Sequence, residues 1–554
     1  MSKKKKLLTW ALVVSLSFSL GFVTDVDDNY FEISKNLDIF GKLYREINSL
    51  YVDDTDPSRL MRTGIDAMLN SLDPYTSYIS ENEIEDLRFM STGQYGGIGA
   101  LVGKRNGKIL ILEPYEDYPA DESGIKAGDE VISVDGKPVV GDGFEVADVR
   151  NLLRGEKGSS LQLEVKRMGE ANPIKLSIRR DRIRIDNVPY HGMLDEEIGY
   201  ISLTGFTQDA GKEVQRATQK MKKEHPDLKG IILDLRDNPG GRLDEAVNVA
   251  NVFIPQKETV VETRGRIDGS QRSHLAQRPA VDTRIPLAVL VNSSSASASE
   301  IVAGAIQDLD RGLIVGQRSF GKGLVQNIRP LSYNTQLKVT TAKYYTPSGR
   351  CIQAINYAER NADGSVARIP DSLKNAFKTR SGRTVYDGGG IEPDIFVEPE
   401  SVERVTIELN RQGIIFDFAT DFVNRNPQAP DAREFVITDA IYQDFMAYSQ
   451  KREFDFSTRA HDQLDKLAAI VKDEAYATQL NNDLRALSLK LDAQKDKDLV
   501  KHRNEIQRLL RLEIVKRYHY QDGAIEASFA DDAEITAAVE ALKDGSQYHK
   551  LLKN

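Results

Sequence analysis

A serine-rich stretch in the second half of the chain could supply a nucleophile. Residues 292–300 read NSSSASASE, directly after the apolar run 287–291 and before a helical apolar face that begins at Ile301. At such a strand-to-helix corner a serine hydroxyl lies beside free helix amides, and the helix dipole favours developing negative charge. This setting suits acyl transfer. Taken alone, a serine before a helix is more often a cap.

A lysine flanked by glycines is the second candidate. Residues 316–326 read GQRSFGKGLVQ, which begins like the phosphate-binding pattern GxxxxGK. The next position is Gly323, where a magnesium-binding Ser or Thr is required, and the following residues predict a strand, so an NTPase is disfavoured. Close packing between glycines can desolvate Lys322, lower its pKa and make it a general base. A lone lysine is usually a solvated surface charge, and only a pairing with Ser297 favours catalysis.

A glycine run earlier in the chain could bind an anion. Residues 95–99 read YGGIG, and consecutive glycines let backbone N–H groups turn toward one point. Alone, this run is more often a tight turn. Residues 127–136, AGDEVISVDG, resemble the core hairpin of a PDZ domain, in which the glycine loop would hold a peptide's terminal carboxylate.

The elements that must position these residues change in type along the chain. Residues 30–89 have helical apolar spacing, broken by a turn at Asp73-Pro74. Glycine-punctuated Val/Ile/Leu runs follow and predict a small β-rich domain. Residues 198–399 alternate apolar strands with helical stretches, which predicts βα units around a buried parallel sheet. Beyond residue 401 the pattern is helical, and Asp531 with Glu534 resembles a capping box.

Composition narrows the function further. The length of 554 residues predicts three or four domains, and 40% apolar with 29% charged residues is typical of globular proteins. A net charge of −10 makes nucleic acid a poor partner. The single cysteine excludes internal disulfides, and the seven histidines lack metal-ligand spacing. We therefore expect no metal and no cofactor.

The first residues predict export. A basic segment, residues 1–6, precedes an apolar run that ends at Val23. This run falls just short of the roughly 20 residues that span a bilayer, so a cleaved signal peptide and a retained membrane anchor both stay open. Either way, we expect the rest of the chain in the periplasm or on the periplasmic face of the inner membrane.

Several co-occurring motifs make the sequence resemble the carboxyl-terminal processing, or tail-specific, proteases. In chain order they are LDP at 72–74, the PDZ segments, DLRDNPGG at 234–241, SASASE at 295–300, FGKG at 320–323 with Gln326, YYTPSGR at 344–350 and GIEPD at 390–394. The resemblance covers about residues 30–399 and leaves the helical carboxyl-terminal part unassigned.

The resemblance implies a role for each matching residue. Ser297 matches the nucleophile, Lys322 the general base and Gln326 the residue that orients this lysine. The N–H groups of Gly241 and Ala298 match the oxyanion hole. Physical chemistry agrees with these roles, because a neutral amine can accept the serine proton and two fixed amides can bind an oxyanion.

Three further expectations complete the picture. Ser295 and Ser299 are rival nucleophiles that fit better as caps or packing residues. Pro239 stands where many relatives carry glycine, which leaves the donor Gly241 in place. Arg154 lies in a turn of the PDZ region that could face the core, so it is a candidate regulatory residue, although a plain surface arginine is the alternative.

The resemblance implies an α/β multidomain fold with a crotonase- or ClpP-like ββα protease core and an inserted PDZ domain. The expected regions are a signal or anchor at 1–23, helices at 30–90, a PDZ domain at 94–185 with a carboxylate loop of Gly96, Gly97, Ile98 and Gly99, a protease core at 186–400, and a helical domain at 401–554.

The expected function is an exported serine endopeptidase that recognises and cleaves proteins or peptides with a free carboxyl terminus. A non-catalytic PDZ adaptor is the alternative, and an acyl-CoA crotonase is disfavoured because it needs no serine–lysine pair. Residues 401–554 are predicted either to bind an adaptor or a second copy, or to buttress the core.

Overall fold

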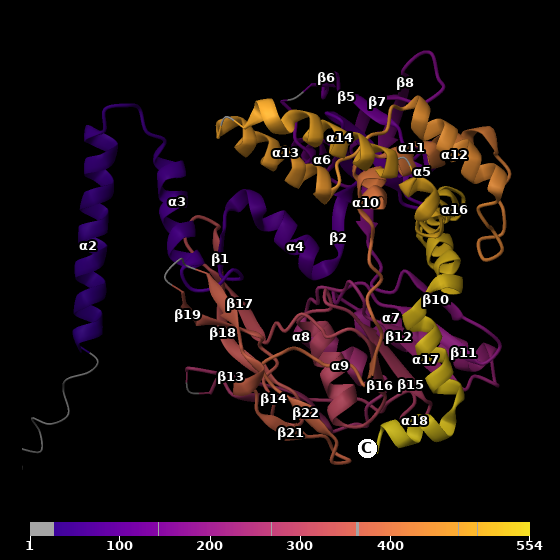
Figure 1. Cartoon of the computed structure of the whole chain (residues 1–554). Helices are drawn as coiled ribbons and strands as arrows, with labels where there is room; N and C mark the ends of the chain where they lie inside the picture. Colours follow the sequence, from indigo (N-terminus) through magenta and orange to yellow (C-terminus); the bar gives the residue numbers. More distant parts are fainter. Residues whose placement is uncertain are drawn as a thin grey trace, which may run out of the picture. The chain divides into compact units, whose positions relative to one another are not determined.

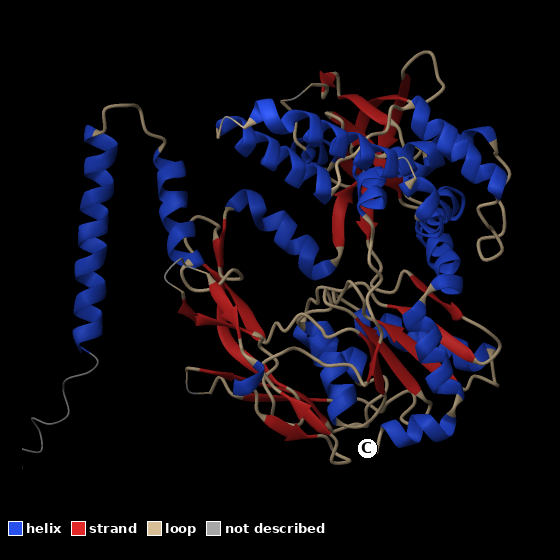
Figure 2. Ribbon diagram, viewed as in Figure 1, coloured by secondary structure: helices blue, strands red, loops and turns tan. Residues whose placement is uncertain are grey.

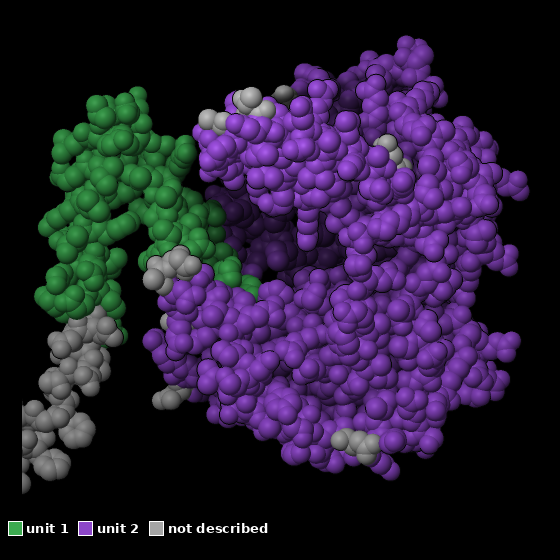
Figure 3. All heavy atoms as spheres, viewed as in Figure 1, with its two compact units in different colours: residues 1–78 green, residues 79–554 purple. Residues whose placement is uncertain are grey.

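A computed structural model describes residues 27–141, 143–267, 269–361, 365–474, 476–495 and 497–553. The predicted signal or anchor at 1–23 lies outside these ranges. Within them, no helix has the length and apolar character needed to cross a bilayer. The chain divides into two compact units, Met1–Tyr78 and Ile79–Asn554 (Figure 3).

The first unit contains the helices α2 (Asp27–Leu50) and α3 (Pro57–Asn70) (Figure 1). Local capping separates them, because Asp56 Oδ1 accepts hydrogen bonds from the N–H groups of Ser58 at 2.9 Å and Arg59 at 3.1 Å. The predicted helical region is therefore interrupted before the expected turn at Asp73-Pro74. The short strand β1 (Ser77–Ile79) spans the unit boundary.

The second unit begins with η1 (Glu81–Glu83) and α4 (Ile84–Thr92), followed by a small β domain. Its elements are β2 (Gln94–Gly97), β3 (Ala100–Arg105), β4 (Lys108–Pro114), α5 (Pro119–Glu122), β5 (Glu130–Val134), β6 (Lys137–Pro138), α6 (Val146–Leu153), β7 (Ser160–Lys166), β8 (Ile174–Arg179) and β9 (Asp181–Arg184). The sheet order is β3-β4-β5-β7-β8, and β2 pairs separately with β9. Alternate residues Leu161, Leu163 and Val165 of β7 are buried in its core, as a half-buried strand requires. The predicted β-rich domain is confirmed.

A six-stranded sheet forms the centre of the larger domain. Its strands are β10 (Tyr190–Met193), β11 (Ile198–Ser202), β12 (Gly230–Asp234), β15 (Leu287–Val291), β16 (Leu313–Gly316) and β23 (Ile395–Phe396), in that spatial order. All neighbours are parallel except β10 with β11. This confirms the predicted buried parallel sheet, whose strands are continuously apolar because both faces are covered.

Helices cover one face of this sheet, and carboxyl-terminal helices cover the other (Figures 1 and 2). On the first face, Ile231 and Leu233 pack in the core that includes α7 (Ala210–Glu224), α8 (Leu243–Ala250) and α9 (Ala298–Asp308). On the opposite face, Ile232 packs with residues of α17 (Ala533–Lys543) and α18 (Gly545–Leu551). The same strand therefore supplies both cores through alternate residues.

A second sheet and two hairpins are formed by segments that lie between strands of the core sheet in sequence. Strand β18 (Gln336–Tyr345) pairs with β17 (Leu324–Pro330) and with β13 (Thr259–Gly265), which pairs with β14 (Arg272–Leu275). The hairpins are β19 (Ile355–Arg360) with β20 (Val366–Arg368), and β21 (Ala376–Lys378) with β22 (Thr384–Tyr386); η2 (Asp371–Leu373) lies between them. The strand predicted after Lys322 is thus present as β17.

The predicted helical carboxyl-terminal region is confirmed. Besides α17 and α18 it contains α10 (Arg404–Arg411), α11 (Ile414–Arg425), α12 (Asp439–Lys451), α13 (Arg459–Asp473), α14 (Ala477–Lys495), α15 (Asp498–Lys501), α16 (Arg503–Ser528) and η3 (Phe529–Asp531). The capping-box prediction was wrong by one residue: Asp532 is the N-cap of α17, and its Oδ1 accepts from Ile535 N at 2.9 Å. Asp531 instead ends η3.

Helices α17 and α18 act as a buttress for the core. Ile535, Ala538, Leu542 and Tyr548 are buried against the sheet, and the Tyr548 hydroxyl accepts a hydrogen bond from Leu287 N at 3.0 Å. This part of the carboxyl-terminal region therefore completes the fold, which favours the buttress over the separate module for these two helices.

Candidate active site

The serine corner lies between β15 and α9. Ser297 is the N-cap of α9 and has a φ of 57°, a value that non-glycine residues seldom adopt. Ser295 Oγ donates to Leu235 O at 2.8 Å, and Ser299 Oγ donates to Asn238 O at 2.9 Å. Both of these side chains are buried, whereas Ser297 is partly exposed. Of the three candidate serines, Ser297 is the one a substrate can reach.

The buried carboxylate of Glu300 joins Ser297 to Lys322. Its Oε2 accepts hydrogen bonds from Ser297 N and Lys322 N, each at 2.8 Å. Its Oε1 accepts from Ser319 Oγ at 2.5 Å and Gly321 N at 2.7 Å. Burial raises the pKa of Glu300, although these four donors oppose that shift. One oxygen atom therefore holds the backbones of the two predicted catalytic residues next to each other.

Tyr344 ties the same two residues together through their carbonyl groups. This side chain of β18 is buried, and its hydroxyl lies 3.0 Å from Ser297 O and also contacts Lys322 O. Glu300 and Tyr344 together contact the N–H and the C=O of both residues. Sequence reasoning gave neither residue a role. The Ser-x-x-Glu spacing at Ser297, which is a capping-box pattern, could have drawn attention to Glu300.

The loop that carries the expected oxyanion donor packs directly on the serine corner. Gly240 has a φ of 101°, and a Cβ built on it would lie 2.8 Å from Ala298 N and 2.9 Å from Ser297 Cβ. A Cβ on Gly241 would lie 2.5 Å from Phe206 O. Within the described residues, neither Gly241 N nor Ala298 N has a protein acceptor. Both glycines are thus required for space, and both expected donors are available.

Asn238 fixes this loop to the corner. It is fully buried, and its Nδ2 donates to Leu203 O at 2.7 Å while its Oδ1 accepts from Gly240 N at 2.9 Å. Its carbonyl accepts from Ala296 N at 3.1 Å. The loop that contains Gly240 and Gly241 is therefore joined to the serine corner by hydrogen bonds.

Two other predicted residues make contacts away from the serine corner. Gln326 Nε2 donates to Thr340 Oγ1 at 3.2 Å across β17 and β18, and its orienting role toward Lys322 stays a prediction. Arg154 follows α6 and pairs with Asp86 of α4 at 2.5 Å. Its guanidinium also lies over the Tyr95 ring, 5.3 Å from the centroid. The regulatory role of Arg154 likewise stays a prediction.

Two of the four residues of the predicted carboxylate loop lie in a strand. Gly96 and Gly97 belong to β2, opposite Arg182 and Asp181 of β9, and close approach of other backbone and ring atoms leaves no room for a side chain at either position. Ile98 and Gly99 form the turn into β3, and Gly99 has a φ of 76°. In the described part of the chain, the N–H groups of these last two residues have no protein acceptor. The end of the glycine run therefore offers free N–H groups, and its carboxylate-binding role stays a prediction.

Comparison with known proteins identifies the parts of the chain. A model of peptidase family S41 matches residues 197–359, a PDZ-domain model matches 110–167, and a model described as a probable PDZ-protease carboxyl-terminal helical domain matches 405–542. The carboxy-terminal-processing protease of Bartonella bacilliformis is 38% identical over 358 residues, 63% of this chain and 81% of that protein. The carboxy-terminal processing protease CtpA of Bacillus subtilis is 36% identical over 57% of this chain and 66% of that protein.

Among solved structures, a photosystem II D1 carboxyl-terminal processing protease is 27% identical, with a TM-score of 0.35, and the match covers 66% of this chain and 93% of that one. The chain belongs to the carboxy-terminal processing proteases of peptidase family S41. It is a serine-type peptidase with a PDZ domain and a carboxyl-terminal helical domain, which confirms the predicted family and fold class.

Proposed function

We propose that this protein is an exported endopeptidase that recognises the carboxyl terminus of a substrate and cleaves it with Ser297 and Lys322. The observation that carries the proposal is the shared Glu300 oxygen, which accepts hydrogen bonds from the N–H groups of both residues at 2.8 Å. The strained, partly exposed Ser297 supports its role as the nucleophile.

In the proposed acylation step, Ser297 Oγ attacks the scissile carbonyl carbon while neutral Lys322 Nζ takes the hydroxyl proton. The oxyanion that forms accepts hydrogen bonds from Gly241 N and Ala298 N. Lys322 then gives the proton to the leaving amine, and the peptide bond breaks. Lys322 then deprotonates a water molecule that attacks the acyl carbon, and it returns this proton to Ser297 Oγ as the ester bond breaks. A positioned general base typically contributes about 10²–10⁴-fold and one oxyanion donor about 10²–10³-fold.

Substrate selection is assigned to the PDZ domain. An extended peptide would add as a strand beside β3, which is at the edge of its sheet. The unpaired N–H groups of Ile98 and Gly99 would receive its terminal carboxylate. Residues 1–23 support export, with either a cleaved signal or a retained anchor. Helices α10 to α16 are proposed to contact an adaptor protein or a second copy of this chain.

The experiment has two matched arms. A peptide with an apolar free carboxyl terminus should bind more tightly than its amide-capped twin, because the cap removes the charge that the amides receive; equal affinities would refute carboxylate recognition. Lys322→Arg should reduce cleavage to near background although it keeps the positive charge, because a guanidinium does not lose its proton near neutral pH. Wild-type cleavage by Lys322→Arg would rule out the lysine base.

A further inference from the structure

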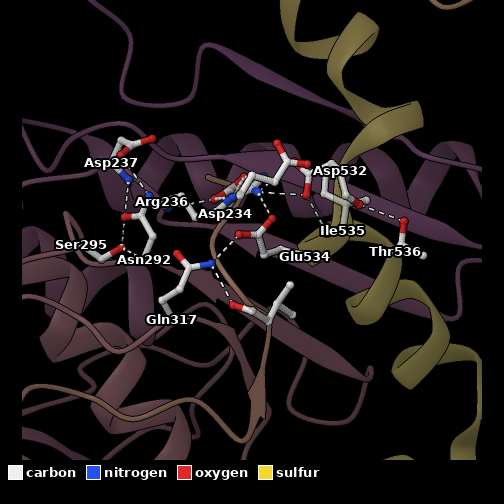
Figure 4. A network of polar contacts seen from close by, with 12 residues as sticks. Asp234, Arg236, Asp237, Asn292, Ser295, Gln317, Asp532, Glu534, Ile535 and Thr536 are labelled. Atoms are coloured by element: carbon white, nitrogen blue, oxygen red, sulfur yellow. Dashed lines mark hydrogen bonds and ion pairs between the residues drawn. The ribbon is translucent and has the colours of Figure 1, made fainter. Parts of the chain in front are cut away.

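The first turn of α17 contacts the beginnings of both loops that form the proposed active site (Figure 4). One loop follows β12, has Arg236 as its second residue and leads to Gly240 and Gly241. The other starts at Gln317, after β16, and leads to Lys322. The α17 residues involved come from the carboxyl-terminal helical domain, some 200 to 300 positions later in the chain.

Arg236 is held at the start of the oxyanion loop by three carboxylates. Its guanidinium contacts Asp234 at 2.6 Å, Asp532 at 2.8 Å and Glu534 at 3.3 Å. Only 16% of the Arg236 side chain is exposed, so water screens these attractions weakly. Burial by itself would lower the pKa of Arg236, but the attraction of Asp234 and Asp532 outweighs burial and raises the pKa.

Asp237, the residue after Arg236, connects this loop to the serine corner. Asp237 has a φ of 57°, its N–H donates to Asn292 Oδ1 at 3.1 Å, and its Oδ1 accepts from Asn292 Nδ2 at 3.0 Å. Asn292 begins the serine corner. The position of the Arg236 guanidinium therefore affects the loop after β12, which is hydrogen-bonded to the serine corner through Asp237 and Asn292.

Glu534 links the second loop to the first. Its Oε1 accepts from Gln317 Nε2 at 2.6 Å, while its Oε2 contacts Arg236 Nη1 at 3.3 Å. The same Gln317 amide lies 3.2 Å from Val397 O, and Gln317 N donates to Val291 O at 2.9 Å. One carboxylate thus contacts Arg236, near the start of the oxyanion loop, and Gln317, the first residue of the lysine loop.

We propose that Glu534, supported by Asp532, is a positioning residue that sets the two catalytic loops relative to each other through Arg236 and Gln317. The proposal rests on the proposed function of Ser297 and Lys322. It gives the carboxyl-terminal helical domain a direct part in hydrolysis besides covering the sheet. A shift of about 1 Å in a reacting group can cost roughly 10²-fold in rate, so a contact outside the site can control turnover.

The test compares Glu534→Gln and Glu534→Ala with Glu540→Gln, a control at an exposed position of the same helix. Turnover is measured with a quenched fluorescent peptide that has an apolar free carboxyl terminus. In both Glu534 variants kcat should fall about 10–100-fold. KM, peptide binding to the PDZ domain and the thermal midpoint should change little, and Glu540→Gln should match the wild type.

A second readout does not depend on catalysis. Amide hydrogen exchange in residues 236–241 and 317–323 should speed up together in Glu534→Gln, because both loops lose one anchor. In an Arg236→Ala, Gln317→Ala background, Glu534→Gln should have no further effect on either readout.

Two results would overturn the proposal: a folded Glu534→Gln with kcat within twofold of the wild type, or unchanged exchange in both loops. If Glu534→Ala does not fold, the isosteric Gln variant decides. A wild type that cleaves nothing would defeat the proposed function, while faster exchange in the two loops of Glu534→Gln would still support the coupling.

Discussion

Replacing Glu300 by glutamine tests whether a buried carboxylate assembles the catalytic pair. The new side chain has the same shape but exchanges one acceptor oxygen for an NH₂ group. Ser297 N and Lys322 N can only donate, whereas the Ser319 hydroxyl can turn and accept. We therefore expect the amide oxygen to stay with the two backbone groups and the NH₂ group to face Ser319, which leaves Gly321 N without an acceptor.

The magnitude follows from these contacts. An orphaned buried N–H costs about 1–3 kcal/mol, and the bonds that remain lose the extra strength of a charged acceptor. Part of this loss is offset because burial raises the pKa of Glu300, which means that its charge is costly to bury. A net loss of about 2–4 kcal/mol is expected. If the whole loss raises the energy of the transition state relative to free enzyme and substrate, kcat/KM falls about 30- to 1000-fold.

The assay is peptide cleavage by Glu300→Gln beside the exposed control Glu540→Gln, with thermal unfolding to verify the fold. The reasoning predicts a folded Glu300→Gln with the stated loss and an unchanged control. A folded Glu300→Gln that keeps kcat/KM within threefold of the wild type would show that the shared carboxylate does not position the pair.

Three more predictions follow from other contacts. Gly240→Ala should lower kcat at least about 100-fold, because its Cβ would lie 2.8 Å from Ala298 N and obstruct an oxyanion donor; steady-state kinetics measures this loss. Burial alone would raise the pKa of Asp282, but Lys222 and two backbone amides outweigh it and lower the pKa to about 2. A lowered pKa stabilises the fold above the ordinary carboxyl range, and this stability is lost as pH falls toward 2. Asp282→Asn should therefore cost about 1–2 kcal/mol near pH 7, allowing for screening at Lys222, whose side chain is 36% exposed, and clearly less near pH 2, where Asp282 is half protonated, as read from thermal midpoints. Truncation after Pro399 should give an insoluble product, because it uncovers the apolar sheet face under α17 and α18, whereas a soluble, folded truncation would contradict the buttress.

The sheet and the helical carboxyl-terminal region could be predicted because their signals are local. Continuous apolar runs are typical of strands buried on both faces, and the run 287–291 places β15 correctly. The leucine pattern after residue 401 likewise predicts helices. It does not say which surface a helix covers, so the packing of α17 on the sheet could not be predicted.

The candidate site was only partly predictable for the same reason. Ser297, Lys322 and Gly241 stand in short motifs that can be recognised in the sequence. Glu300 and Tyr344 contact both proposed catalytic residues only once β15, β17 and β18 are placed in space, because Lys322 is distant from both in sequence. The capping-box spacing links Glu300 to Ser297 locally, but no local pattern links Glu300 or Tyr344 to Lys322.

The structure also corrects two local predictions, one about a loop and one about a helix cap. Gly96 and Gly97 look like loop residues by composition, but pairing with β9 makes them part of a strand. Asp532 rather than Asp531 caps α17, because η3 continues through Asp531. The first difference arises from pairing with a strand that is distant in sequence. The second arises from a helix boundary shifted by one residue.

The central claim is that Ser297 is the nucleophile of this peptidase. It is tested most directly by incubating an unfolded model protein with the wild type, with Ser297→Ala and with Ser294→Ala, whose altered side chain is exposed in the same corner, and by measuring the product masses. We predict defined fragments from the wild type and from Ser294→Ala, and an intact substrate with folded Ser297→Ala. The same fragments from Ser297→Ala at a comparable rate would contradict the account.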